Sequence, residues 1–238
     1  GSIELPRSRA WLILCFSLLV SIVLVSIISW AAQRIMTVDN TTASSLSLAG
    51  TWQFYWGQLL TPADFAQPST SLAPPATIMV PSSWSGQVLG ATINDGRPLP
   101  TFGVATYRTR ITLPATVVNS HSVLMLEGVG SAYQVWVNGR LVGGLGHIGA
   151  PTDSVARTIE TPQISVNLIT ITPAPQLDIV VQVSNYAFRE SGIFGMVMIE
   201  QPNAATVSVV RRYVLPDVLL MGVFFVIGFY HLMTYFTS

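Results

Sequence analysis

The stretch from Ser131 to Gly143 constrains the fold most, because its pattern specifies a β-hairpin. Tyr133, Val135 and Val137 occupy every second position, which is the period of a half-buried strand. Asn138-Gly139 follows and supplies two residues that tolerate positive φ, as a two-residue hairpin turn requires. The apolar residues after this turn resume the extended pattern. We therefore predict two antiparallel strands joined at Asn138-Gly139.

Further strand-like segments lie on both sides of this hairpin. They are residues 52–56, 107–113, 122–127, 178–185 and 195–200. Residues rich in Gly, Pro, Asn and Ser separate them, and the Pro-rich stretch 61–81 favours an irregular path over the surface. Short strands divided by turns are typical of a β-sandwich. We expect an all-β domain over residues 46–203, built from two antiparallel sheets.

An apolar segment without any charged residue, Trp11–Ala32, precedes the expected β domain. As a helix it is long enough to cross a hydrocarbon core of roughly 30 Å. Arg7 and Arg9 lie before it, so the positive-inside rule places the N-terminus in the cytoplasm. A cleaved signal peptide is the alternative, because Ser29-Trp30-Ala31 has small residues at the spacing of a cleavage site. Signal peptides have shorter apolar cores, so we favour an uncleaved anchor.

A second apolar segment, Tyr213–Phe236, follows the β domain. Asp217 and His231 lie near its two ends, where the membrane interface can hold polar side chains. We predict a transmembrane helix rather than a buried core helix, and the first of several such helices in a longer protein. The expected order is a cytoplasmic N-terminus (1–10), an anchor helix (11–32), a linker (33–45), the β domain (46–203), a second linker (204–212) and a second transmembrane helix (213–236).

The composition supports this arrangement and excludes several classes of function. Hydrophobic residues make up 50% of the chain and charged residues only 9%, as expected for membrane segments joined to an uncharged domain. The net charge is zero, so we expect no nucleic-acid partner. Cys15, the only cysteine, lies in the first apolar segment, which excludes an internal disulfide and a Cys-based zinc site. We expect no metal and no cofactor, and the lipid bilayer as a partner.

Glu127 is predicted to form an ion pair within the β domain. In an extended strand it shares one face with Val123 and Met125, and a buried carboxylate without a partner is costly. Arg108 or Arg110, on the preceding predicted strand, is the expected partner. A contact between Glu127 and a ligand is the alternative.

Several short motifs occur in an order that resembles a known family. They are Leu48-Ala49-Gly50-Thr51-Trp52-Gln53-Phe54, Val80-Pro81-Ser82-Ser83-Trp84, Tyr107-Arg108, the hairpin segment 135–143 and Gly192-Ile193-Phe194-Gly195. Together they resemble the N-terminal sugar-binding jelly-roll domain of family-2 glycoside hydrolases, over about residues 46–201. This resemblance implies a galactose-binding-like jelly-roll sandwich.

A second resemblance concerns Gly103-Val104-Ala105-Thr106-Tyr107-Arg108. This segment is similar to the signature Gly-x-x-Thr-Tyr-Arg of bacterial seven-transmembrane receptors with diverse intracellular signalling modules, which carry an extracellular jelly-roll domain. The resemblance implies a carbohydrate-like or small-molecule ligand, an intracellular module beyond this chain, and an inner-membrane location with the β domain on the periplasmic side. The segment 213–236 would then be the first of seven helices.

The residues that we expect to contact a ligand come from loops and strand ends. They are Trp84, Tyr133, Asn138, His147, Asn185 and Arg189. Trp84 would stack on a sugar face and the others would supply hydrogen bonds. No catalytic residue is predicted, because the acidic residues lie in no recognisable catalytic motif and glycoside hydrolysis needs two carboxylates at a defined separation. Two alternatives remain, an assembly subunit that docks a membrane partner protein or forms a homodimer, and a glycosidase fragment.

Overall fold

The computed structural model describes residue 26 and residues 45–67, 75–114, 122–149, 166–172 and 174–237. The chain divides into two compact units, and the β domain belongs to the unit Ser44–Ala205. The predicted anchor helix 11–32 lies outside the described residues except for Ser26, which is helical, and so do the predicted N-terminus and most of the first linker.

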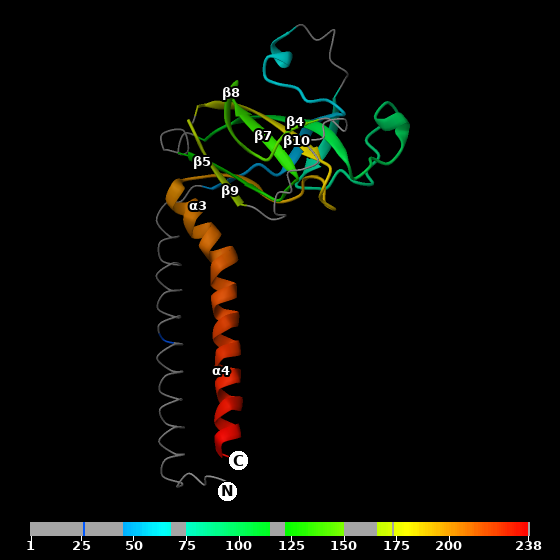
Figure 1. Cartoon of the computed structure of the whole chain (residues 1–238). Helices are drawn as coiled ribbons and strands as arrows, with labels where there is room; N and C mark the ends of the chain where they lie inside the picture. Colours follow the sequence, from blue (N-terminus) through cyan, green and yellow to red (C-terminus); the bar gives the residue numbers. More distant parts are fainter. Residues whose placement is uncertain are drawn as a thin grey trace. The chain divides into compact units, whose positions relative to one another are not determined.

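Within the described residues, the larger sheet of the β domain has six antiparallel strands. In spatial order they are β3 (Ala76–Val80), β2 (Gly50–Trp56), β4 (Gly103–Thr112), β10 (Gln176–Asn185), β7 (Ala132–Val137) and β8 (Arg140–Leu145). Figure 1 shows β4, β10 and β7 side by side in its upper part. β4 and β10 pair over their whole length, from Gly103 opposite Asn185 to Thr112 opposite Gln176.

The smaller sheet, in the part of the chain that the structure describes, has four strands and completes the sandwich. Its order is β1 (Leu46–Ser47), β12 (Val197–Glu200), β5 (Ser122–Glu127) and β9 (Val166–Ile171), and a short pair joins β11 (Gly192–Ile193) to β6 (Val129–Gly130). Two 3₁₀ turns, η1 (Asp64–Ala66) and η2 (Asn94–Gly96), lie in loops. The predicted β-sandwich is confirmed. Residues 76–80, which were expected to be irregular, form β3, an edge strand that ends immediately before Pro81, where proline disturbs no ladder.

Apolar side chains from both sheets form the core. Val135 and Val181 from the larger sheet and Leu124 and Ile199 from the smaller sheet have no exposed surface. Each of them points inward, and the residues next to it along its strand point to the opposite face of the sheet. Burying each such side chain contributes about 1.5–3 kcal/mol to folding, which makes this interior the main source of stability.

The predicted hairpin is confirmed at Asn138-Gly139. Val137 of β7 lies opposite Arg140 of β8, and φ is 50° at Asn138 and 82° at Gly139, which are values for a turn of the primed type. The Asn138 side chain also bonds to the neighbouring strand, because its Oδ1 accepts from Asp178 N at 2.8 Å and its Nδ2 donates to Gln176 O at 3.2 Å. Asn138 therefore fixes both the turn and its position against β10.

An aromatic cluster fills one end of the core. The ring centroids of Phe54 and Tyr107 are 5.0 Å apart, and those of Trp56 and Trp84 are 5.3 Å apart. Gly192 lies against this cluster, since a Cβ at that position would be 2.2 Å from Tyr107 Oη and 3.0 Å from a Trp84 ring carbon. The absence of a side chain at Gly192 therefore leaves the space that the Tyr107 and Trp84 rings occupy.

The residues after the sandwich form a helix. α3 (Pro202–Val209), a π-helical turn η3 (Val210–Val214) and α4 (Leu215–Thr237) follow one another without a break. The segment 204–212, which was predicted to be a linker, is helical, because Pro202 suits the first turn of a helix and no Gly or Pro interrupts the chain before residue 216. Among the described residues, Pro202–Tyr235 is the one helix that is long and apolar enough to cross a membrane.

We expect Gly192→Ala to destabilise the β domain more than Gly139→Ala. Both glycines have φ near 80°, but a Cβ at Gly139 would meet nothing within 4 Å. The strain of a left-handed alanine is therefore common to both variants, and overpacking against Tyr107 should add about 1–3 kcal/mol to the loss for Gly192→Ala. Chemical denaturation followed by tryptophan fluorescence measures the difference. Equal losses would show that the aromatic cluster can move aside.

Candidate functional site

The outer face of the six-stranded sheet carries polar and charged side chains. One cross-strand row on this face runs from Gln53 through Arg108 and Val180 to Trp136, because these residues are opposite one another in the strand register. The next position along β4 and β10 places Arg110 opposite Asp178. Residues two apart on a strand share a face, so the register itself brings the two arginines and the aspartate together.

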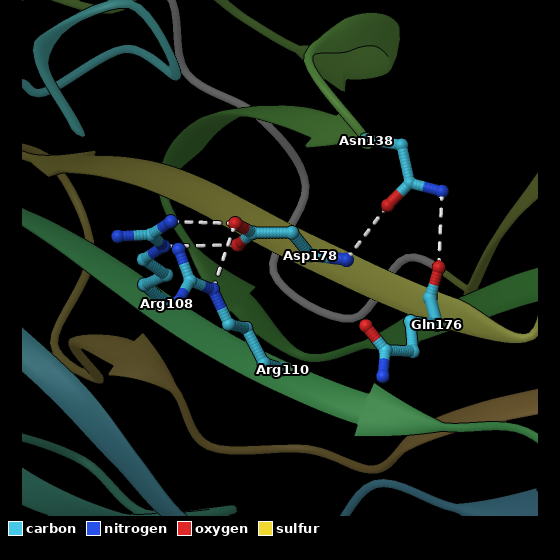
Figure 2. A network of polar contacts seen from close by, with 5 residues as sticks. All are labelled: Arg108, Arg110, Asn138, Gln176 and Asp178. Carbon is cyan, nitrogen blue, oxygen red and sulfur yellow. Dashed lines mark hydrogen bonds and ion pairs between the residues drawn. The ribbon is translucent and has the colours of Figure 1, made fainter. Parts of the chain in front are cut away.

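Asp178 binds both arginines. Arg108 donates from Nε to Oδ1 at 2.9 Å and from a terminal nitrogen to Oδ2 at 2.5 Å, and Arg110 donates from Nε to the same Oδ2 at 3.0 Å. Figure 2 shows both arginine side chains directed at the carboxylate, with Asn138 bonded to the backbone of the same strand. The exposed side-chain fraction is 12% for Arg108, 31% for Asp178 and 69% for Arg110. The ion pair between Arg108 and Asp178 is thus largely shielded from solvent, whereas the Arg110 guanidinium is accessible.

The predicted partner of Arg108 was wrong. Glu127 lies on β5 in the four-stranded sheet, opposite Val166, whereas β4 pairs with β10 in the six-stranded sheet. Asp178 is therefore the carboxylate that the register places beside the arginines. The spacing of charges along single strands could not reveal this, because strand order depends on contacts far apart in the chain.

The electrostatics of the group keep Asp178 ionised. Partial burial alone would raise the pKa of the Asp178 carboxyl, but the hydrogen bonds from Arg108 and Arg110 outweigh burial and hold that pKa below its ordinary value of 3.8. The hydrogen bond to Asp178 raises the pKa of Arg108 in turn. Two guanidinium groups facing one carboxylate leave one net positive charge on this part of the sheet.

A loop after β2 forms a wall beside this group. Thr106 Oγ1 accepts from Leu60 N at 2.8 Å and donates to Gln58 O at 2.8 Å, which holds the loop against the sheet. Further along, the Phe65 ring lies 4.2 Å from the Arg108 guanidinium carbon, a cation–π contact. Asp64 Oδ2 accepts from both the backbone and the hydroxyl of Thr61 at 2.7 Å, and these bonds lower the pKa of Asp64. The wall is therefore fixed by specific polar contacts.

Three depressions surround Arg110 on this face. The first has a volume of about 280 Å³ and is lined by Phe65, Arg108, Arg110, Asn138 and Asp178 among others. The second, of about 490 Å³, adds Gln176 and Thr112, and the third, of about 240 Å³, adds Thr51 and Gln53. A concave surface with a few convergent polar groups and a neighbouring ring is typical of a small-molecule site. We take this surface, defined by Arg108, Arg110, Asn138 and Asp178 with Phe65, as the candidate site.

The chemistry that these residues offer is binding. Asp178 is the single carboxylate among the residues that line the three depressions, whereas glycoside hydrolysis uses two carboxyl groups. Within the part of the chain that the structure describes, no group of three His, Cys, Asp or Glu side chains could hold a metal ion. Guanidinium and amide donors around a depression suit a ligand rich in oxygen acceptors.

Of the residues predicted to contact a ligand, Asn138 lines this site. Trp84 and Tyr133 are core residues, exposed by 0% and 1%, and Trp84 Nε1 donates to Pro100 O at 3.0 Å. The Trp84 ring therefore has no exposed face on which a sugar could stack, contrary to the prediction. An aromatic residue next to a loop is compatible with either a core or a surface position, and the sequence pattern could not separate the two.

The remaining candidates lie elsewhere. Asn185 is buried, and its side chain donates to Thr101 O at 3.0 Å and Phe188 O at 2.9 Å and accepts from Phe188 N at 3.1 Å, so it organises the loop after β10. His147 and Arg189 are exposed but line none of the three depressions, and their roles stay predictions. Sequence reasoning missed Arg110 and Asp178 as binding residues, although their charges on otherwise apolar strands were a visible signal.

A family model described as the sugar-binding domain of family 2 glycosyl hydrolases matches residues 46–202. The chain belongs to this family. The match covers the whole sandwich, from β1 through β12, and identifies the fold as the jelly roll of that domain. No curated protein matches the chain in sequence.

The solved structures that are similar to this chain include β-glucuronidases, at low sequence identity. The enzyme from Faecalibacterium prausnitzii is 20% identical with a TM-score of 0.48, and the match covers 68% of this chain and 32% of that enzyme. The enzyme from Ruminococcus gnavus is 20% identical with a TM-score of 0.46, over 68% of this chain and 29% of the enzyme. The one from Bifidobacterium dentium is 18% identical with a TM-score of 0.49, over 68% and 30%. The chain thus spans less than a third of the length of these structures.

We expect Asp178→Asn to lower stability at neutral pH and to have less effect in acid. The pKa of Asp178 is lower in the folded protein than in the unfolded chain, so its ion pairs stabilise the folded state above about pH 4, where a free carboxyl is ionised. This stabilisation is lost as the pH falls through the pKa that Asp178 has in the folded protein. The loss at pH 7 should be about 1–3 kcal/mol, because charged hydrogen bonds are removed.

Denaturation curves of the wild type and the variant between pH 7 and pH 3 measure this effect. Asp95→Asn, which removes an exposed carboxylate in the turn η2, is the matched control. It should leave the free energy of unfolding nearly unchanged across this range. If the wild type and Asp178→Asn differ in free energy of unfolding by the same amount across this range, the stabilising role assigned to the ionised Asp178 carboxylate is wrong.

Proposed function

We propose that this chain is the extracytoplasmic ligand-sensing part of a membrane-anchored bacterial signalling receptor that binds a carbohydrate-like small molecule. The observation that carries the proposal is the direct succession of a sugar-binding-type domain, matched over 46–202, and a helix of membrane-spanning length, Pro202–Tyr235. A domain of this family has a precedent for sugar binding, and an apolar helix whose side chains are not buried within the protein needs an apolar environment. The β domain then lies on the periplasmic side of the inner membrane.

The short connection between sheet and helix supports a signalling role. Only Gln201 separates the end of β12 at Glu200 from the start of α3 at Pro202. A change in the sandwich can therefore be passed to the helix through the chain itself, without a flexible tether. A ligand can shift such a system only if it binds two arrangements with different affinity, so the proposal requires that the candidate site differ between them. The output module would lie in a part of the protein beyond this chain.

Ligand binding can be tested with the whole chain in non-ionic detergent micelles. Titration calorimetry with a panel of mono- and oligosaccharides should show binding, and Arg110→Ala should weaken it about tenfold or more, since a charged hydrogen bond contributes about 1.5–3 kcal/mol. Arg97→Ala, at an exposed arginine outside the candidate site, is the matched control and should leave binding unchanged. Absence of saccharide binding combined with tight binding of a membrane protein would favour the assembly function instead.

The orientation of the helix can be tested by cysteine accessibility. On a Cys15→Ser background, Asp95→Cys in the exposed turn η2 should react with a membrane-impermeant maleimide in intact spheroplasts. Ser238→Cys, beyond the apolar helix, should react only after the membrane is permeabilised, and Phe224→Cys, in its apolar centre, should be protected in both states. Reaction of residues 95 and 238 from the same side would contradict a membrane-spanning helix.

A further inference from the structure

The accessible end of the arginine group, Arg110, indicates which chemical class of ligand the candidate site selects. This step rests on the proposed function. Arg110 commits its Nε to Asp178, and its two terminal nitrogens have no acceptor among the described residues. The side chain is 69% exposed and borders all three depressions. An arginine with one edge fixed and the other facing a concave surface presents two parallel donors to a ligand.

The acceptors on the protein side are almost fully used. Asp178 Oδ1 accepts from Arg108, and Oδ2 accepts from both Arg108 and Arg110. A carboxylate has about four acceptor positions, so three of these are occupied. The site therefore has donors in excess and one uncompensated positive charge, and a neutral ligand would leave that charge unpaired.

We propose that the ligand is an acidic saccharide and that Arg110 binds its carboxylate through the two terminal guanidinium nitrogens. A carboxylate matches the site in charge, because it carries the single negative charge that the two arginines and Asp178 leave unbalanced. It also matches in shape, because its two oxygens lie in one plane and accept the two parallel N–H bonds of a guanidinium. A phosphate monoester, with a charge of about −1.5 to −2 at pH 7, would bring more negative charge than the site can neutralise.

The neighbouring groups suit the rest of a sugar ring. Asn138 uses its Oδ1 and one Nδ2 hydrogen on β10, which leaves one amide hydrogen without an acceptor among the described residues. Asn138 borders the first two depressions together with Arg110, so it lies within the same concave surface as the proposed carboxylate site. A carboxylate held by Arg110 would thus place ring hydroxyls toward an amide donor.

The test compares an acid with its neutral counterpart. Calorimetry on the whole chain in non-ionic detergent, at 0.15 M salt, is performed with oligogalacturonate, its methyl ester and the matching galactose oligosaccharide. We expect the acid to bind at least tenfold more tightly than the ester. Arg110→Gln should remove this preference for the acid. Arg110→Lys should retain only part of the preference, because a single ammonium cannot make the bidentate pair. Arg97→Gln, the control, should retain all of it. Unchanged thermal unfolding of Arg110→Gln confirms that the loss is local.

The outcomes separate this inference from the proposed function. Equal binding of acid, ester and galactose oligosaccharide, each weakened by Arg110→Gln, would overturn carboxylate recognition and leave saccharide sensing standing. Binding of succinate as tight as that of oligogalacturonate, lost in Arg110→Gln, would support carboxylate recognition and overturn saccharide sensing. Binding of none of these probes would overturn both. A preference for the acid that survives in Arg110→Gln would overturn the assignment to Arg110.

Discussion

The pairing of β4 with β10 is the interaction on which the rest of the sandwich depends. Its unbroken register runs from Gly103 opposite Asn185 to Thr112 opposite Gln176, and each strand also pairs with a further neighbour, β2 or β7. The inner face of this pair supplies Tyr107 and Val181 to the core. Its outer face carries Arg108, Arg110 and Asp178. A slip of one residue would exchange these two faces, so the same constraint determines both stability and the site.

Local features of the sequence predicted the local structure well. The Asn138-Gly139 turn needs two residues with positive φ, and few other pairs of residues supply them, so this hairpin could be located from sequence alone. Alternation along residues 122–127 gave the bounds of β5 correctly. The strand β9 and the edge strand β3 were missed, because short edge strands carry a weak pattern and Pro-rich surroundings masked the second of them. The helical residues 204–212 were missed because polar and small residues there resemble a linker.

The site was harder to predict, because it depends on strand order rather than on strand identity. Arg108 and Asp178 are 70 positions apart in sequence, whereas Glu127 is much nearer to Arg108 along the chain. Only the crossover that places β10 beside β4, with β5 in the other sheet, decides between the two carboxylates. The position of Trp84 could not be predicted for a related reason. A tryptophan between loop residues can belong to the core when a distant glycine, here Gly192, leaves space for its ring.

Asp178 joins the candidate site to the fold in two ways. Its carboxylate binds the arginines of β4, while its backbone N–H donates to the side chain of Asn138 in the β7–β8 turn. A ligand carboxylate on the terminal nitrogens of Arg110 would draw the guanidinium away from Asp178 and weaken the bond from Nε to Oδ2. The residue most exposed to a ligand is thus bonded to the strand that organises the larger sheet. Ligand binding would then alter the contacts of β10 and of the hairpin together, and the proposed sensing function requires such a difference between the free and bound states.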